Sequence, residues 1–142
     1  MKSLHFEQWW PYASAITVLA CWALILGFPF PNNPDPLMGA SGTIASVLVG
    51  FLATAKAVIL GITGSEVFKK LKAAGYSNLL FSYLSQAVFG GIVLLVVSTF
   101  GFFFPRQPPP LWFQYLWVMA AATAILLYVR ITRLLFTLIE KA

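Results

Sequence analysis

The few side chains able to do acid–base, nucleophilic or metal chemistry are scattered along this chain of 142 residues. The only histidine is His5, and the four acids are Glu7, Asp35, Glu66 and Glu140. Enzymes need such groups to converge, and the sequence holds no phosphate-binding loop, dinucleotide fingerprint, HExxH or CxxC motif. A lone cysteine in an apolar run allows neither an internal disulfide nor a cysteine metal site. We therefore expect a non-enzymatic protein with no catalytic residues, no cofactor and no metal.

Lys56 is the one charge well inside an apolar stretch, so its surroundings decide how it is interpreted. Its flexible stem could carry the ammonium group to the headgroup layer, which needs no further function. Alternatively it faces inward, where antiparallel pairing about residue 71 places Gln86 at the same level, with Tyr83 and Tyr128 nearby. Because buried polar groups in lipid need partners, we expect these four side chains to form an intramembrane polar layer. Such a layer would be a counter-ion site, a pore lining or an oligomer lock.

The composition places the chain in a membrane. Apolar residues make up 60% of it and charged residues only 9%, with a net charge of +5. A soluble domain has about 25% charged residues and could not cover its surface with so few. The basic residues cluster at the ends of apolar segments, so membrane topology explains them better than nucleic-acid binding, and no direct contact with nucleic acid is expected.

Four stretches approach the roughly 20 apolar residues that cross a hydrocarbon core of about 30 Å. We place the spans at residues 12–30, 40–63, 79–104 and 112–135. The first and third separators are rich in proline, and the second is basic. This pattern predicts an all-α integral membrane four-helix bundle that forms a single domain over residues 1–142.

The basic residues also predict the orientation, because cytoplasmic loops carry an excess of lysine and arginine. With the N-terminus inside, seven of these residues fall on the cytoplasmic side and one falls outside. The seven are Lys2, Lys69, Lys70, Lys72, Arg130, Arg133 and Lys141, and the one is Arg106. We therefore expect a multi-pass protein of the inner membrane with both termini in the cytoplasm.

A short helix is predicted at residues 65–75, between the second and third spans, with Ser65 as N-cap and Gly75 as terminator. It would lie along the inner leaflet. Its lysines could set the orientation, rest among anionic headgroups at about 1 kcal/mol each, or dock a cytosolic partner. The residues expected to meet a partner or lipid headgroups, which we call the basic inner face, are Lys69, Lys70, Lys72, Arg130 and Arg133.

The second span carries a stripe of small residues on one helical face. Its members are Gly42, Ser46, Gly50, Thr54, Ala57 and Gly61. Leu48, Leu52 and Ile59 fall on the opposite face at 100° per residue. Small residues let helix backbones approach closely in lipid, so we expect the stripe to pack either inside the bundle or against a second copy of the chain.

A resemblance covers residues 42 to about 90. The sequence GFLATA at residues 50–55, followed by Ile-Leu at 59–60 and a basic hairpin, resembles small four-span bacterial membrane proteins. The membrane subunit of Kiwa-type antiphage defence is similar in size and topology. This resemblance implies an oligomeric membrane sensor that recruits a separate cytosolic effector.

These observations predict a non-enzymatic, oligomeric inner-membrane component of a bacterial antiphage defence or stress system. It would act as a membrane sensor or anchor and dock a cytosolic protein on its basic inner face. The alternative is a small oligomeric ion channel or holin-like pore lined by Lys56 and Gln86.

Overall fold

The computed structural model describes residues 2–26, 30–61, 64, 76–104 and 109–140. Within these ranges the regular secondary structure is entirely helical, which confirms the predicted all-α class for the described residues. The elements are α1 (Lys2–Cys21), continued by the short π-helix η1 (Trp22–Leu26), then α2 (Asp35–Gly61), α4 (Tyr76–Gly101) and α5 (Leu111–Glu140).

Prolines mark the beginnings of two helices. Pro36 is the second residue of α2, and Pro110 directly precedes α5. Proline suits these positions because the N–H it lacks would be unbonded in the first turn and its φ is already helical. The Pro110 carbonyl accepts backbone hydrogen bonds from Phe113 and Gln114 at 2.9 and 3.2 Å. The Gln114 side-chain amide also donates to the Pro109 carbonyl at 2.7 Å, which fastens the start of α5.

Hydroxyl side chains inside the helices mostly bond their own backbone. Each donates to the carbonyl four residues earlier at 2.8–3.0 Å, so the hydroxyl needs no partner from another helix. The donors are Thr17, Thr43, Ser46, Thr54, Thr99 and Thr132. The chain thus tolerates many serines and threonines in an apolar setting.

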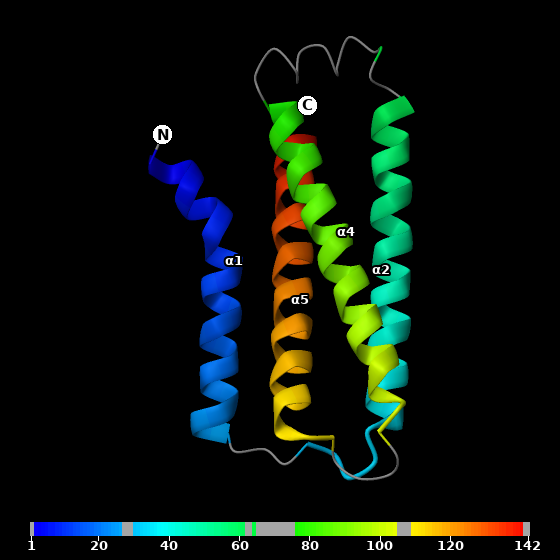
Figure 1. Ribbon diagram of the computed structural model, residues 1–142. Coiled ribbons are helices and arrows are strands. Elements are labelled where there is room, and N and C mark those ends of the chain that lie inside the picture. Colours follow the sequence, from blue (N-terminus) through cyan, green and yellow to red (C-terminus); the bar gives the residue numbers. More distant parts are fainter. Residues whose placement is uncertain (1, 27–29, 62–63, 65–75, 105–108, 141–142) are drawn as a thin grey trace.

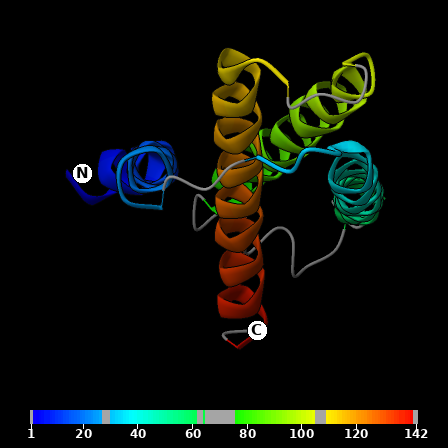
Figure 2. The ribbon, with the colours of Figure 1, turned by 90° about the horizontal axis from the view of Figure 1, so that it is seen from below.

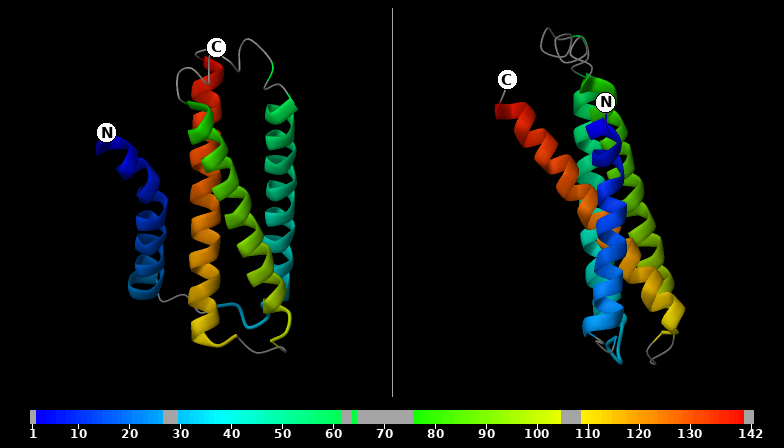
Figure 3. Two further views of the ribbon diagram at one scale, coloured as in Figure 1. Left: turned by 45° about the horizontal axis from the view of Figure 1, so that its top comes forward. Right: turned by 90° about the vertical axis from the view of Figure 1, so that its left-hand side faces the viewer.

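The four long helices stand side by side in a row rather than closing into a compact bundle (Figures 1 and 2). Their order across the row is α1, α5, α4, α2, and the extensive helix contacts are between these neighbours. The start of α1, the end of α2, the start of α4 and the end of α5 all lie at one end of the row, at the top of Figure 1. We call this the terminal end. From the side, α5 is tilted away from the other helices (Figure 3).

The core lies between α2, α4 and α5 and forms three clusters along their length. The cluster towards the terminal end includes Leu52, Leu84 and Ile131, and the middle one is made of Ala45, Leu94 and Ala124. The third, at the proline-rich end, consists of Phe30, Met38, Val97 and Phe113. Helix α1 adds little to these clusters, because its extensive contacts with the other long helices are with α5.

Three helices among the described residues are long and apolar enough to cross a membrane. They are Asp35–Gly61, Ser77–Gly101 and Leu111–Phe136. They confirm helices of sufficient length and apolarity at the predicted spans 40–63, 79–104 and 112–135, with limits that differ by a few residues. The predicted first span, 12–30, is not among them: α1 begins at Lys2, contains Pro11 and changes to the π-helix at Trp22. A fourth span therefore stays a prediction.

The predicted interfacial helix at 65–75 lies outside the described residues, and so do its lysines Lys69, Lys70 and Lys72.

Candidate functional site

A buried arginine joins α4 to α5 near the terminal end. Arg130 of α5 is only 6% exposed. Its Nη2 donates a hydrogen bond of 2.6 Å to the side-chain carbonyl of Gln86 on α4. Its guanidinium carbon lies 3.8 Å from the ring centroid of Tyr83, which is a cation–π contact. We call Tyr83, Gln86 and Arg130 the arginine cluster.

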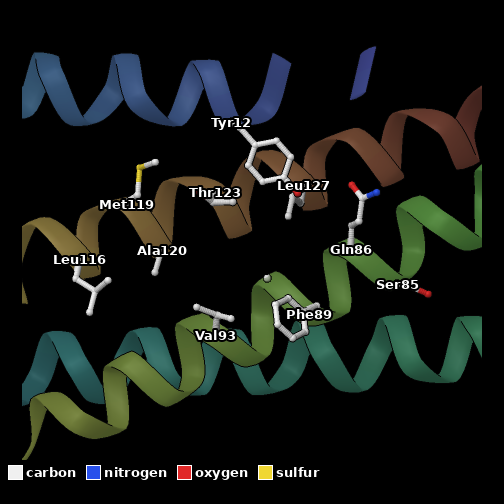
Figure 4. A pocket seen from close by; sticks show the side chains of 11 residues that line it. Tyr12, Ser85, Gln86, Phe89, Val93, Leu116, Met119, Ala120, Thr123 and Leu127 are labelled. Carbon is white, nitrogen blue, oxygen red and sulfur yellow. The ribbon is translucent and has the colours of Figure 1, made fainter. Parts of the chain in front are cut away.

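A second polar contact joins α2 to α4. The Lys56 Nζ donates to the Ser85 hydroxyl oxygen at 3.0 Å. Lys56 is half-buried and Ser85 is exposed at the surface of the row. We call this pair the lysine site. The lysine site joins α4 to α2 and the arginine cluster joins α4 to α5, because Ser85 and Gln86 project from α4 in different directions (Figure 4).

The predicted polar layer is thus divided into two sites. Lys56 does lie level with residues 85 and 86, but Ser85, not Gln86, receives its hydrogen bond. Gln86 and Tyr83 are held by Arg130 instead. Tyr128 is half-buried and packs against the apolar cluster at the terminal end, so the structure places it in the core.

Arg130 is a buried residue whose surroundings the sequence reasoning did not anticipate. It was expected on the basic inner face with Arg133, whereas the structure places its side chain between α4 and α5, where it is 6% exposed. The helical period holds a signal that could have found it, since Arg130 follows Leu127 by three residues and precedes Leu134 by four. Those leucines belong to the apolar side that packs on α4, whereas Arg133 is exposed.

A further polar node, which the sequence reasoning missed, lies in the half of the row nearer the proline-rich end. The hydroxyl of Ser98 on α4 is fully buried and lies 2.8 Å from the hydroxyl of Ser41 on α2. The indole N–H of Trp117 on α5 donates to the same Ser98 oxygen at 3.3 Å. This node links three helices by side-chain hydrogen bonds. Because it consists of two serine hydroxyls and one indole N–H, we interpret it as a structural contact.

The small-residue stripe of α2 faces outward. Gly50 and Gly61 would carry a Cβ with no atom within 4 Å, and Gly42 alone approaches α4, at 3.9 Å from Ser98 Cβ. The other members of the stripe, Ser46, Thr54 and Ala57, are exposed. It is the opposite, leucine-bearing face that packs on α4, with Leu52 buried and Ile59 against it. Of the two alternatives for the stripe, packing inside this chain does not apply to its exposed members.

Two grooves flank α4. The larger, of about 490 Å³, lies between α4, α5 and Tyr12 of α1 (Figure 4). Its walls are mainly apolar, and Gln86 and Ser85 stand at one end. The smaller, of about 370 Å³, lies between α2 and α4 and includes the lysine site. Ser85 and Phe89 line both, so they form the ridge between the grooves.

In the part of the chain that the structure describes, no group of three or more histidine, cysteine or acidic side chains is placed to hold a metal ion. Comparisons with protein-family models, with curated proteins and with solved structures gave no match. The fold and sites define the class of this chain as a helical protein with three candidate membrane spans. It has two sites where a basic side chain bonds a neighbouring helix, and an exposed face of small residues.

Proposed function

We propose that the chain is a non-enzymatic, oligomeric component of the bacterial inner membrane that anchors or senses there and docks a cytosolic protein on its basic inner face. The observation that carries this proposal is the exposed small-residue stripe on α2, the helix at the edge of the row. An antiphage defence or stress system is the setting we propose, on the resemblance of residues 42–90 to small membrane proteins of such systems.

The stripe suits contact with another helix better than contact with lipid alone. Helices in a bilayer associate through close packing, because lipid tails are as apolar as leucine, and small residues permit the closest approach. Thr54 and Ser46 already bond the carbonyls of Gly50 and Gly42, so the stripe carries no unpaired hydroxyl donor that would resist burial. These features support self-association through α2.

The arrangement of the helix ends supports one basic face. Helix α2 ends and α4 begins at the terminal end, where α1 starts and α5 ends (Figure 1). If this end is cytoplasmic, as the basic residues predict, then Lys69, Lys70, Lys72 and Arg133 share one side of the membrane. Arg130 is removed from this face by its burial.

A charge-reversal variant tests the docking role. Co-purification in mild detergent would compare the wild type with a chain in which Lys69, Lys70 and Lys72 are changed to Glu, and with a chain in which they are changed to Arg. We expect a cytosolic protein to be retained by the wild type and the arginine variant and lost from the glutamate variant, because docking there depends on positive charge. Identical co-purified proteins from all three chains would contradict the docking role.

A single substitution tests self-association. Gly50→Leu is expected to weaken the oligomer at least tenfold, because it places a bulky side chain where two backbones would approach. It should leave the fold of one chain intact, since nothing lies within 4 Å of this position. Phe51→Leu is the matched control, because Phe51 is 60% exposed beside the stripe. Native mass spectrometry would report the subunit number, and an equal effect of both variants would exclude the stripe as the interface.

A further inference from the structure

We propose that the smaller groove, between α2 and α4, is a binding site for one anionic phospholipid, with the lipid phosphate at Lys56 and an acyl chain along the apolar wall. The groove is lined by Ala53, Lys56, Ser85, Val88, Phe89 and Ile92. One of these residues is a cation and none is an acid. The site requires a membrane around the chain, and it does not depend on the docking role or on the small-residue stripe.

The groove has a polar end and an apolar end in the order that a lipid needs. Lys56 lies five residues from Gly61, the end of α2, and so is near the membrane surface at the terminal end. Ala53 lies one turn deeper, and along α4 the lining runs from Ser85 to Ile92, away from that surface. The cation therefore marks the mouth of the groove, and the apolar side chains extend from it towards the middle of the bilayer.

Depth estimates fit a lipid of the leaflet at the terminal end. At 1.5 Å per residue, Lys56 lies about 12 Å from the midpoint of α2, and the hydrocarbon of one leaflet is about 15 Å thick. The ammonium group is thus within reach of a phosphate at the hydrocarbon boundary. From Ser85 to Ile92 the groove extends about 10 Å along α4, which covers most of the depth of one leaflet.

The hydrogen-bonding capacity of Lys56 favours a phosphate over a neutral group. An ammonium carries three N–H donors, and among the described residues the Ser85 hydroxyl is the acceptor that it contacts, at 3.0 Å. Ser85 accepts one bond and holds the ammonium over the groove, so the other donors can meet phosphate oxygens. Basic pockets between membrane helices bind anionic headgroups in this way, whereas a choline headgroup would bring a second cation to the site.

The test measures lipid binding to the full chain after delipidation in detergent, by native mass spectrometry. The probes are dioleoylphosphatidylglycerol and dioleoylphosphatidylcholine, which differ in headgroup charge and share their acyl chains. We expect the wild type to bind the anionic lipid about fivefold more tightly, the order that one basic residue near a membrane surface supplies. Lys56→Gln should abolish this preference and Lys56→Arg should keep it.

Further variants separate the headgroup contact from the groove. Ala53→Phe fills part of the apolar wall and keeps the lysine, so it should weaken binding of both lipids, while Phe51→Leu, outside the groove lining, should change neither. Glycerol 3-phosphate, which has the phosphate and no acyl chains, should not displace the anionic lipid. Equal affinities for the two lipids in the wild type, an unchanged preference in Lys56→Gln, or displacement by glycerol 3-phosphate would each overturn the proposal. Circular dichroism of every variant confirms that its helices are retained.

Discussion

Replacing Gly91 with alanine is expected to be about 1–3 kcal/mol less favourable to folding than the same replacement at Gly50, the usual cost of overpacking a well-filled contact. Gly91 is a buried position on α4 that faces Val49 of α2. A Cβ there would lie 2.6 Å from Val49 Cγ2, whereas a Cβ at Gly50 would meet nothing within 4 Å. Both glycines are within helices, so the gain in helix propensity is common to both and cancels in the comparison.

Val49 cannot easily move out of the way. Its β-branched side chain has one strongly preferred rotamer in a helix, so the clash must be relieved by shifting α2 away from α4. A second variant tests this reason. In a Val49→Ala background the clashing methyl group is gone, and the remaining neighbours of the new Cβ lie at 3.9 Å, which is an ordinary contact. The cost of Gly91→Ala should then fall below about 0.5 kcal/mol.

The measurement is the free energy of unfolding, obtained by titrating the chain with dodecyl sulfate in phospholipid–detergent micelles. The chains measured are the wild type, Gly50→Ala, the single variants Gly91→Ala and Val49→Ala, and the double variant of these last two. If Gly91→Ala cost the same with valine and with alanine at position 49, the packing of α2 on α4 through Gly91 would be contradicted.

The long apolar helices α2, α4 and α5 were predictable because a long run of apolar residues has few stable alternatives to a membrane helix. The first predicted span stays a prediction, since the apolar run of α1 follows a polar first half and continues into a π-helix at Trp22–Leu26. The order of the helices in the row was also out of reach. It depends on which faces interlock, and α4 meets both α2 and α5 through glycines at positions 90 and 91.

The sequence predicted the small-residue stripe on α2 but did not decide whether that face packs within the chain or against a second copy. Small residues are equally suited to packing within a chain and between chains, so their spacing could not decide between Leu52 and Gly50 as the inward position. The structure makes Leu52 the buried one. Within the chain, the glycines that let neighbouring helices approach closely are on α4. Gly90 and Gly91 are adjacent in the middle of this apolar helix.

The polar level was predictable from antiparallel geometry, but the hydrogen-bond partners were not. Counting residues from the hairpin places Lys56 level with residues 85 and 86, and one residue of difference turns a side chain by 100° around the helix. Because of that rotation, Lys56 donates its hydrogen bond to Ser85, and Arg130 donates to Gln86. A method that weighs only charge assigns Arg130 to water or headgroups, whereas its position among Leu127, Ile131 and Leu134 assigns it to the core.

Gln86→Leu is expected to destabilise the chain by about 2 kcal/mol, within the range for hydrogen bonds to charged groups. The substitution removes the acceptor at 2.6 Å from Arg130 Nη2, while the guanidinium stays 6% exposed between α4 and α5. Burial makes the loss larger than at a surface, because water cannot replace the missing acceptor. The free energy of unfolding in mixed micelles again provides the measurement.

Removing the charge together with its acceptor should reverse much of this loss. Arg130→Met keeps a long side chain but leaves the Gln86 carbonyl without its donor, so we expect it to cost about 1 kcal/mol on its own. In the double variant both partners are apolar, and apolar pairs of similar size often match buried polar pairs in stability. The double variant should therefore be more stable than Gln86→Leu alone.

Arg133→Met, at an exposed position of the same helix, is the control and should change stability by less than about 0.5 kcal/mol. Additive losses in the double variant would mean that Gln86 and Arg130 act separately, and the arginine cluster would then not be the contact that couples α4 to α5.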